Sequence, residues 1–395
     1  MATALLTNSS QIFVFLILII GITYWLSQRQ KLRKFFRYLT PVLWIYFLPM
    51  LATTLGVIPA ESPVYSWIRD HLLPAALILL LLSANLPTIA KLGGKAILTM
   101  LAGSFGIVIG GPIVLLIFNN YLPAESWKAL AALSGSWIGG SANLVAISES
   151  VKTPPALLGP IIVVDTVIGY SWMGIVIALS AFQARFDHWR TVDSSIIDDI
   201  NQRLTELNET NRRPLMFTDL TTMMILAFGG GYLCLELGKK LPQVGVVINA
   251  FAWTIILVTT LGLLLSFTRL SQLEYAGASH VGNFFLFLLL ASIGARADLK
   301  AIFELPLFIA VGISWLLIHA GCLIIAGKMS KVPMFLMATA SQANIGGPVT
   351  APIVASVYQK SMAPVGLLMA VLGNILGIYG GLLCAQFCYW VDKYF

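Results

Sequence analysis

The chain has 395 residues, of which 58% are hydrophobic and only 10% are charged, and its formal net charge is +7 at pH 7. Soluble domains carry charges on about a quarter of their residues, so this composition excludes a soluble domain with a single core and predicts a polytopic protein of the lipid bilayer. The positive charge is therefore no sign of a nucleic-acid partner. Five basic residues between positions 29 and 37 directly follow the first apolar segment, which is typical of a cytoplasmic topology anchor.

Twelve apolar segments follow one another along the chain, six in each half, and they predict an all-α membrane fold. In the first half they cover residues 11–26, 41–58, 72–90, 95–118, 127–149 and 156–183. In the second half they cover residues 217–236, 245–267, 278–296, 302–326, 333–357 and 362–390. The first segment precedes its basic cluster, the reverse of the charge order of a secretory signal, so we expect a retained helix with its N-terminus outside.

An internal repeat relates the two halves. The sequence SGSWIGGSAN at residues 134–143 recurs 207 residues later as SQANIGGPVT at residues 341–350. Two further echoes have shifts of 206 and 209: residues 53–56 with 259–262, and Pro155, Asp165 and Tyr170 with Pro364, Asn374 and Tyr379. The predicted organisation is a first membrane repeat at 1–183, a polar linker at 184–216 and a second repeat at 217–395. Paired glycine-interrupted segments at corresponding positions are typical of secondary transporters.

The interrupted segments, residues 127–149 and 333–357, decide how the halves are oriented. Each is either a re-entrant hairpin or a crossing helix with a break, because non-helical backbone at membrane depth must be buried or line a wet cavity. Ten crossings and two hairpins place 16 Lys and Arg residues inside and 8 outside, whereas twelve crossings place 13 inside and 11 outside. The inside bias of basic residues favours about ten transmembrane helices, two re-entrant or broken segments and inverted repeats.

The interrupted segments are also the predicted binding site. A break in a membrane helix frees N–H groups that suit an anion and carbonyl groups that suit a cation, and glycine lets a ligand approach the backbone. The predicted substrate-binding residues are Ser134, Ser136, Gly139, Gly140, Ser141, Asn143, Ser341, Gln342, Asn344, Gly346, Gly347 and Thr350. The alternative is that small residues merely permit close helix packing. Their duplication and amide content favour the binding site.

Asp165 stands inside an apolar segment, where a carboxylate costs about 2.5–3.5 kcal/mol on insertion scales unless it is paired, protonated or coordinated. Its repeat counterpart is Asn374. One carboxylate with neutral oxygens suits a monovalent cation better than Mg²⁺, so we predict a sodium site at Asp165, Asn374, Asn143 and Thr350. Proton transfer at Asp165 stays open. The structural alternative is a carboxylate satisfied by hydroxyls such as that of Thr166.

Other sequence motifs say less about function. No phosphate-binding loop, nucleophile elbow or zinc-ligand spacing is present, and these absences predict no catalytic residue, no enzyme activity and no cofactor other than a coupling ion. We interpret His319 as a packing histidine and Arg296 with Asp298 as an interfacial pair, and His280 receives no role. A channel and an intramembrane hydrolase are the alternatives outside the transporter class.

The glycine-centred repeats, each followed by Asp165 or Asn374 in the next segment, resemble the YjcL-like family of uncharacterised bacterial membrane proteins. That family is similar, more distantly, to the cation:proton antiporter and anion transporter superfamily, which includes sodium/glutamate, citrate and bile acid symporters. The resemblance implies an elevator-type transporter of the bacterial inner membrane, with a mobile core, a scaffold that forms a homodimer, and sodium coupling. The function expected is secondary active transport of a small polar or anionic organic solute, coupled to sodium or alternatively to protons.

Overall fold

The computed structural model describes residues 4–32, 35–36, 39–82, 84, 89, 92–189, 213–297, 305–359 and 362–395. Within these ranges the regular structure is helical, apart from one isolated antiparallel bridge between Val244 and Ile248. Most of the predicted linker, and Asp298 of the predicted interfacial pair, lie outside the described residues.

Each predicted apolar segment overlaps one helix, a pair of helices or three consecutive helical elements. The first half forms α1 (Ser9–Ser27), α3 (Pro41–Thr54), α4 (Pro63–Trp67) continued by η2 (Ile68–Leu72) and α5 (Leu73–Leu81), α7 (Gly94–Phe118), α8 (Ser126–Gly139), α9 (Ser141–Ser150) and α10 (Pro155–Leu179). The second half forms α13 (Phe217–Met224) continued by η4 (Ile225–Gly230) and α14 (Gly231–Lys240), α15 (Ala250–Ser266), α16 (Ala278–Ala295), α17 (Leu305–Ser330), α18 (Met334–Ile345), α19 (Gly347–Tyr358) and α20 (Ala363–Tyr394).

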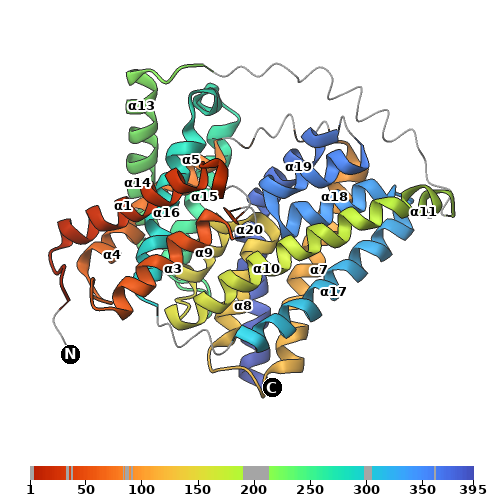
Figure 1. Ribbon diagram of the computed structural model, residues 1–395, viewed down its shortest axis with the longest axis horizontal. Coiled ribbons are helices and arrows are strands. Elements are labelled where there is room, and N and C mark those ends of the chain that lie inside the picture. Colours follow the sequence, from red (N-terminus) through yellow and green to blue (C-terminus); the bar gives the residue numbers. More distant parts are fainter. Residues whose placement is uncertain are drawn as a thin grey trace.

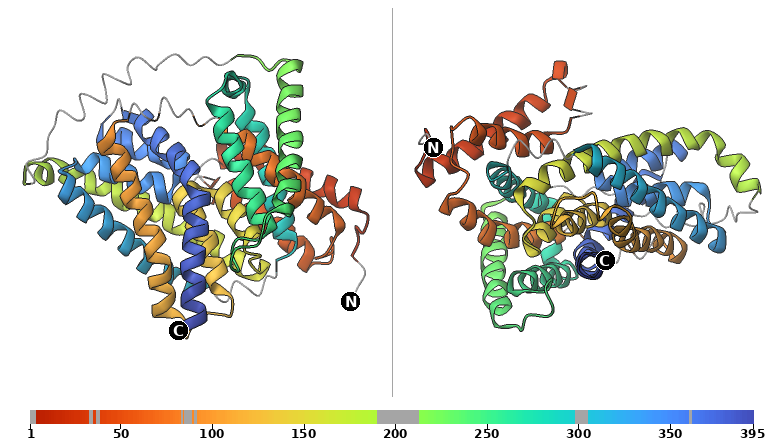
Figure 2. Two further views of the ribbon diagram at one scale, coloured as in Figure 1. Left: turned by 180° about the vertical axis from the view of Figure 1, so that it is seen from behind. Right: turned by 90° about the horizontal axis from the view of Figure 1, so that it is seen from below.

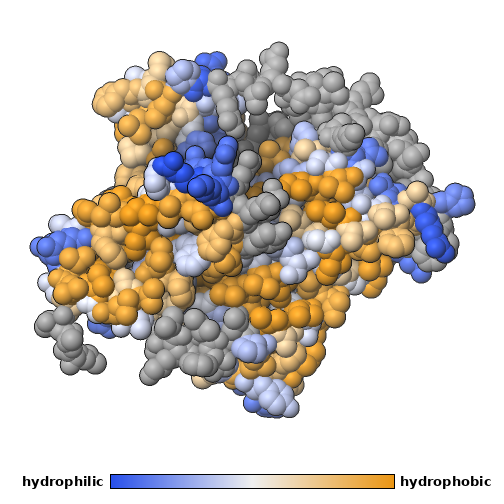
Figure 3. All heavy atoms as spheres, viewed as in Figure 1, coloured by the Kyte–Doolittle hydropathy of each residue, from blue (hydrophilic) through white to orange (hydrophobic). Residues whose placement is uncertain are grey.

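Length and composition identify the chain as a multi-pass membrane protein. Among the described residues, eight helices are long and apolar enough to cross a bilayer. A ninth candidate is α15 together with the 3-10 helix η5 (Arg269–Ala276), which lies at 94° to it. The outward faces carry large apolar side chains, as on α1, where Val14, Leu18 and Ile22 are each more than half exposed. The space-filling view shows such side chains over much of the visible surface (Figure 3). A surface of this kind is suited to lipid.

The helices pack in two groups (Figures 1 and 2). The core group contains α7, α8, α9, α10, α17, α18, α19 and α20, and the scaffold group contains α1, α3, α4, α5, α13, α14, α15 and α16. Helices of each group pack mainly against one another, and contacts between the groups are fewer, as between α15 and both α9 and α20. Each group takes three segments from each half of the sequence, so the packing units cut across the two sequence repeats.

The core group is built from crossed contacts between the halves. α20, the last helix of the second half, packs along α8, and α10, the last helix of the first half, packs against α18 and α19. α7 packs against its repeat counterpart α17. The last helix of each half therefore supports the interrupted segment of the other half.

Each interrupted segment turns back on itself. In hairpin 1 (α8 and α9), the Thr153 hydroxyl, just beyond α9, donates a hydrogen bond to the backbone oxygen of Lys128 near the start of α8, at 3.1 Å. In hairpin 2 (α18 and α19), Gln342 donates a side-chain hydrogen bond across the turn to the Thr350 hydroxyl, at 2.8 Å. The two arms of each hairpin therefore lie side by side, with the glycine pair at the tip.

The hairpins approach α10 from opposite ends. Hairpin 1 ends at Ser150, and a short loop joins it to Pro155, the first residue of α10. The Tyr358 hydroxyl at the end of hairpin 2 donates a hydrogen bond to the backbone oxygen of Val176, near the last turn of α10, at 2.7 Å. A helix of 25 residues is about 37 Å long, enough to span the hydrocarbon core of a bilayer. The bases of the two hairpins are therefore separated by roughly the thickness of a membrane.

Candidate functional site

The two glycines at each hairpin tip are required for different structural reasons. Gly140 and Gly347 occupy equivalent repeat positions and both have a positive φ, +82° and +66°, which side chains other than glycine adopt only with strain. A Cβ atom on Gly347 would meet nothing within 4 Å, and one on Gly140 would meet only the Asn374 Oδ1 atom at 3.5 Å. Space is therefore open at both tips.

The preceding glycine of each pair is required by packing. A Cβ atom on Gly139 would lie 2.5 Å from the backbone oxygen of Gly373 and would also overlap the Asn143 side chain. A Cβ atom on Gly346 would overlap the side chains of Gln342 and Thr350. Both repeats thus use one glycine for the turn and one for close approach.

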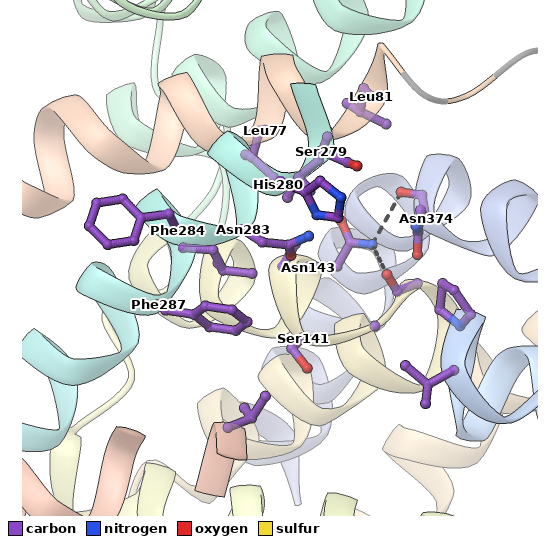
Figure 4. Close-up of a pocket in the computed structure, with 18 of the residues that line it drawn as sticks. Leu77, Leu81, Ser141, Asn143, Ser279, His280, Asn283, Phe284, Phe287 and Asn374 are labelled. Atoms are coloured by element: carbon purple, nitrogen blue, oxygen red, sulfur yellow. Dashed lines mark hydrogen bonds between the residues drawn. The ribbon is translucent and has the colours of Figure 1, made fainter. Parts of the chain in front are cut away.

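An amide side chain ties each tip to the last helix of the opposite half. At hairpin 1, the Asn143 Nδ2 atom donates hydrogen bonds to the backbone oxygens of Gly139 at 2.7 Å and Asn374 at 3.1 Å (Figure 4). At hairpin 2, the Gln342 Nε2 atom, which bonds to Thr350, also lies 3.4 Å from the backbone oxygen of Gly169 on α10. An amide therefore holds each tip, but the two amides occupy different repeat positions: Asn143 lies on the second arm of hairpin 1 and Gln342 on the first arm of hairpin 2.

Asp165 accepts a hydrogen bond from hairpin 1. The Ser136 hydroxyl, one helical turn before the tip, donates a hydrogen bond to the Asp165 Oδ2 atom at 2.9 Å. The Thr166 hydroxyl instead donates to the backbone oxygen of Ile162. The predicted sodium ligands are thus distributed over three hydrogen-bond groups: Asn143 with Asn374, Thr350 with Gln342, and Asp165 with Ser136.

Three further predicted binding residues also make hydrogen bonds within the core group. The hydroxyl of Ser134 donates to the backbone oxygen of Ala131 at 2.6 Å. Asn344 donates a side-chain hydrogen bond to the Ser104 hydroxyl at 3.0 Å. The Ser341 hydroxyl accepts a hydrogen bond from the Trp172 indole at 2.8 Å.

His319 connects three helices of the core group. Its Nδ1 atom lies 2.9 Å from the backbone oxygen of Gly103 on α7, and its Nε2 atom lies 2.9 Å from the Ser341 hydroxyl on α18. A carbonyl oxygen only accepts, so Nδ1 carries the proton, and Nε2 is then free to accept the Ser341 hydroxyl proton. These contacts agree with the interpretation of His319 as a packing histidine.

A cavity of about 950 Å³ lies between the core group and the scaffold group. Both tips reach it: its lining includes Gly139, Gly140, Ser141 and Asn143 of hairpin 1, and Pro348 and Val349 of hairpin 2, with Asn374 beside them (Figure 4). Asp165 is outside the cavity lining. The other predicted substrate-binding residues are outside it too: Ser134, Ser136, Ser341, Gln342, Asn344, Gly346, Gly347 and Thr350.

The opposite wall contains polar residues that sequence reasoning missed. Ser279, His280 and Asn283 on α16 line the cavity, and His280 and Asn283 point towards hairpin 1 (Figure 4). Their spacing of three and four residues places Asn283 on the same helix face as the other two, and this was the signal available in the sequence. Glu274 accepts hydrogen bonds from the backbone N–H of Ser279 at 3.0 Å and from its hydroxyl at 2.6 Å, and so caps the start of α16.

The base of hairpin 1 contacts the scaffold group through polar side chains. The Arg296 guanidinium at the end of α16 lies 3.6 Å from the Glu149 carboxylate, whose side chain is only 10% exposed. The Asn249 side chain donates a hydrogen bond to the backbone oxygen of Ser150 at 2.7 Å. Arg296, predicted to pair with Asp298, thus has an ion-pair partner on hairpin 1.

The described part of the chain holds no group of three or more His, Cys, Asp or Glu side chains arranged to bind a metal ion. Its helices and paired hairpins define a multi-pass helical membrane protein with a duplicated, glycine-tipped element. The sequence profile of the family described as "Protein of unknown function (DUF819)" matches residues 14–390, and the chain belongs to this family.

A curated relative supports the same assignment. Over 340 residues the chain is 25% identical to the "Uncharacterized membrane protein YjcL" of Bacillus subtilis (strain 168), an alignment that covers 84% of this chain and 85% of the relative. The expected relation to a YjcL-like family is confirmed.

Proposed function

We propose that this protein is a secondary active transporter of a small polar or anionic organic solute, and that it is not an enzyme. The observation that carries the proposal is the cavity between the helix groups, which both glycine-tipped hairpins reach. Helix starts at such tips present backbone N–H groups to a ligand near the middle of the bilayer, the arrangement of many carrier sites.

The two halves are inverted repeats in this proposal. Support comes from the hairpins, whose arms return to the side from which they started and whose bases lie near opposite ends of α10. Two re-entrant segments leave ten crossings, five in each half, and an odd number per half reverses the orientation of the second repeat. Basic-residue bias then places the linker in the cytoplasm, in the inner membrane of a bacterium.

An elevator movement follows from the two-group packing. The core group carries both tips, whereas the scaffold group supplies the opposite cavity wall through α1, α5 and α16. Because the contacts between groups are fewer than those within them, we propose that the core moves as a body and that the scaffold forms a homodimer. This mechanism would place the family in the superfamily of cation:proton antiporters and anion transporters.

Asp165 is our proposed coupling residue, with sodium as the preferred ion and the proton as the alternative. Its hydrogen bond to Ser136 joins the half-buried carboxylate to the helical turn that carries the tip of hairpin 1. A cation bound there would therefore act directly on the position of that tip. Asn143, Thr350 and Asn374 would supply neutral oxygens in the proposal.

Accessibility of the cavity from both sides of the membrane tests the transporter function without knowledge of the solute. Val349 is 71% exposed and lines the cavity. In a background without the four native cysteines, we expect Val349→Cys to react with an impermeant thiol reagent from either side, in right-side-out and in inside-out vesicles. Val357→Cys, on the same helix but outside the cavity lining, is the control for lipid-facing positions. Reaction of Val349→Cys from one side only would contradict alternating access.

Surface labelling tests the hairpin geometry separately. Ala124 and Ala156 are exposed and flank hairpin 1, so Ala124→Cys and Ala156→Cys are both expected to react with impermeant reagent in intact cells. Met329→Cys, next to the base of hairpin 2, should be protected until the cells are permeabilised. Opposite labelling of the two alanine positions would mean that the segment between them crosses the membrane.

A further inference from the structure

The scaffold side of the cavity is largely apolar and aromatic. Tyr24 of α1 and Phe287 of α16 line it and contact each other with ring centroids 5.3 Å apart. Phe284 and Leu77 extend the same wall. When such a wall covers apolar surface of a ligand, the free energy of binding becomes more favourable in proportion to the area removed from water.

The cavity as a whole offers little positive charge. No Lys or Arg side chain belongs to the described lining, and the only carboxylate there is Glu274, which already accepts two hydrogen bonds from Ser279. The donors at hairpin 1 are backbone groups: α9 starts at Ser141 without a side-chain cap, and the N–H groups of Ser141 and Ala142 have no partner among the described residues. These N–H groups and the positive helix end suit a single anionic group.

We infer that the cavity binds an amphipathic organic monocarboxylate. Its carboxylate lies at the start of α9, within reach of Asn283 and His280 on the opposite wall, and its apolar body packs against Tyr24, Phe284 and Phe287. A second carboxylate on the ligand would lie against the aromatic wall without a partner, and burying an unpaired charge there is costly. The inference rests on the proposed transport function and narrows its substrate class.

Binding by the purified full-length protein in lipid nanodiscs tests this inference. The probes are butyrate, hexanoate and octanoate, with octanedioate and 1-octanol as comparison compounds, measured by calorimetry. We expect affinity to rise about two- to fourfold per added CH2 group. Octanedioate and 1-octanol should each bind at least tenfold more weakly than octanoate.

Two variants locate the binding within the cavity. Ser141→Pro removes one N–H group from the start of α9, a position where proline is tolerated and where the second repeat already has Pro348. It should weaken octanoate binding about tenfold and leave 1-octanol binding unchanged. Phe287→Ala should weaken octanoate binding at least fivefold, whereas Phe285→Ala, whose ring packs on Phe228 away from the cavity lining, should not.

The outcomes separate the substrate class from the transport function. Tighter binding of octanedioate than of octanoate would overturn the inference. Octanoate binding that neither Phe287→Ala nor Phe285→Ala weakens would also overturn it, because such binding indicates partition into lipid. Equal weakening by both variants would overturn it too, because the effect would then not come from the cavity wall. Failure of octanoate to bind at all would also overturn it. Binding as expected without accumulation in proteoliposomes under a sodium or proton gradient would support the inferred site and contradict secondary transport.

Discussion

Valine in place of Gly347 is expected to abolish solute transport while the protein stays folded and inserted, and Gly140→Val is expected to do the same. Both residues have a positive φ, and Gly140, with a ψ of 178°, lies in a region that is almost restricted to glycine. A side chain there costs about 1–3 kcal/mol in backbone strain, less than the stability of an ordinary protein. The new side chain would occupy the open space at the tip. Uptake by proteoliposomes is the measurement, with a solute chosen because it raises the thermal unfolding temperature of the protein.

Gly56→Val is the matched control. Gly56 has a φ of +72°, and a Cβ atom on it would meet nothing within 4 Å, but it lies in the loop after α3, far along the chain from either tip. The substitution therefore also places a valine at a positive φ, without filling the site. Normal transport by either tip variant would move the site elsewhere, and loss of folded protein in the tip variants alone would support the packing alternative.

Replacing Asp165 by asparagine is expected to eliminate ion-driven accumulation of solute. The substitution preserves size and an acceptor for the Ser136 hydroxyl but removes the negative charge, and it makes the two repeats alike at this position. Exchange of solute down its own gradient should continue, because the cavity lining is unchanged. Uptake driven by a sodium gradient, by a pH gradient and by solute exchange are the three measurements.

The same measurements distinguish the two coupling ions. A sodium-coupled carrier responds chiefly to external sodium, whereas a proton-coupled carrier follows the protonation of Asp165. Ser136→Ala removes the hydrogen bond but keeps the carboxylate, so we expect it to change the ion concentration that gives half-maximal uptake without eliminating coupling. Full uphill uptake by Asp165→Asn with unchanged ion dependence would assign this residue a structural role.

Hydropathy and glycine spacing predicted the helical segments well. Segment position follows from local composition, and the predicted segment at 278–296 matches α16, Ala278–Ala295, almost residue for residue. The third segment was less accurate: its predicted start at residue 72 differs from the start of the helical stretch at Pro63, while its predicted end lies outside the described residues. Arg69 and Asp70 interrupt the apolar pattern within this stretch, and they pair with each other at 2.8 Å, which makes two charges tolerable in a membrane helix.

The walls of the site were less predictable, because they depend on which helix face meets which neighbour. Nothing in the local sequence separates Asn143, which reaches the cavity, from Asn344, which bonds to Ser104 inside the core group. His280 lies near the end of its predicted segment and looked like an ordinary boundary residue, yet the packing of α16 turns it towards hairpin 1. Such assignments require the distances between helices that are remote in sequence.

The polar contacts at the base of hairpin 1 describe one end state of the proposed movement. The ion pair of Glu149 with Arg296 and the hydrogen bond from Asn249 to Ser150 join the core group to the scaffold group, so displacement of the core must break both. A carrier that cycles needs two end states of comparable free energy, since the minor state must remain populated. The opposite end state must therefore replace these contacts with others of similar strength, and weakening either contact shifts the resting population towards that state.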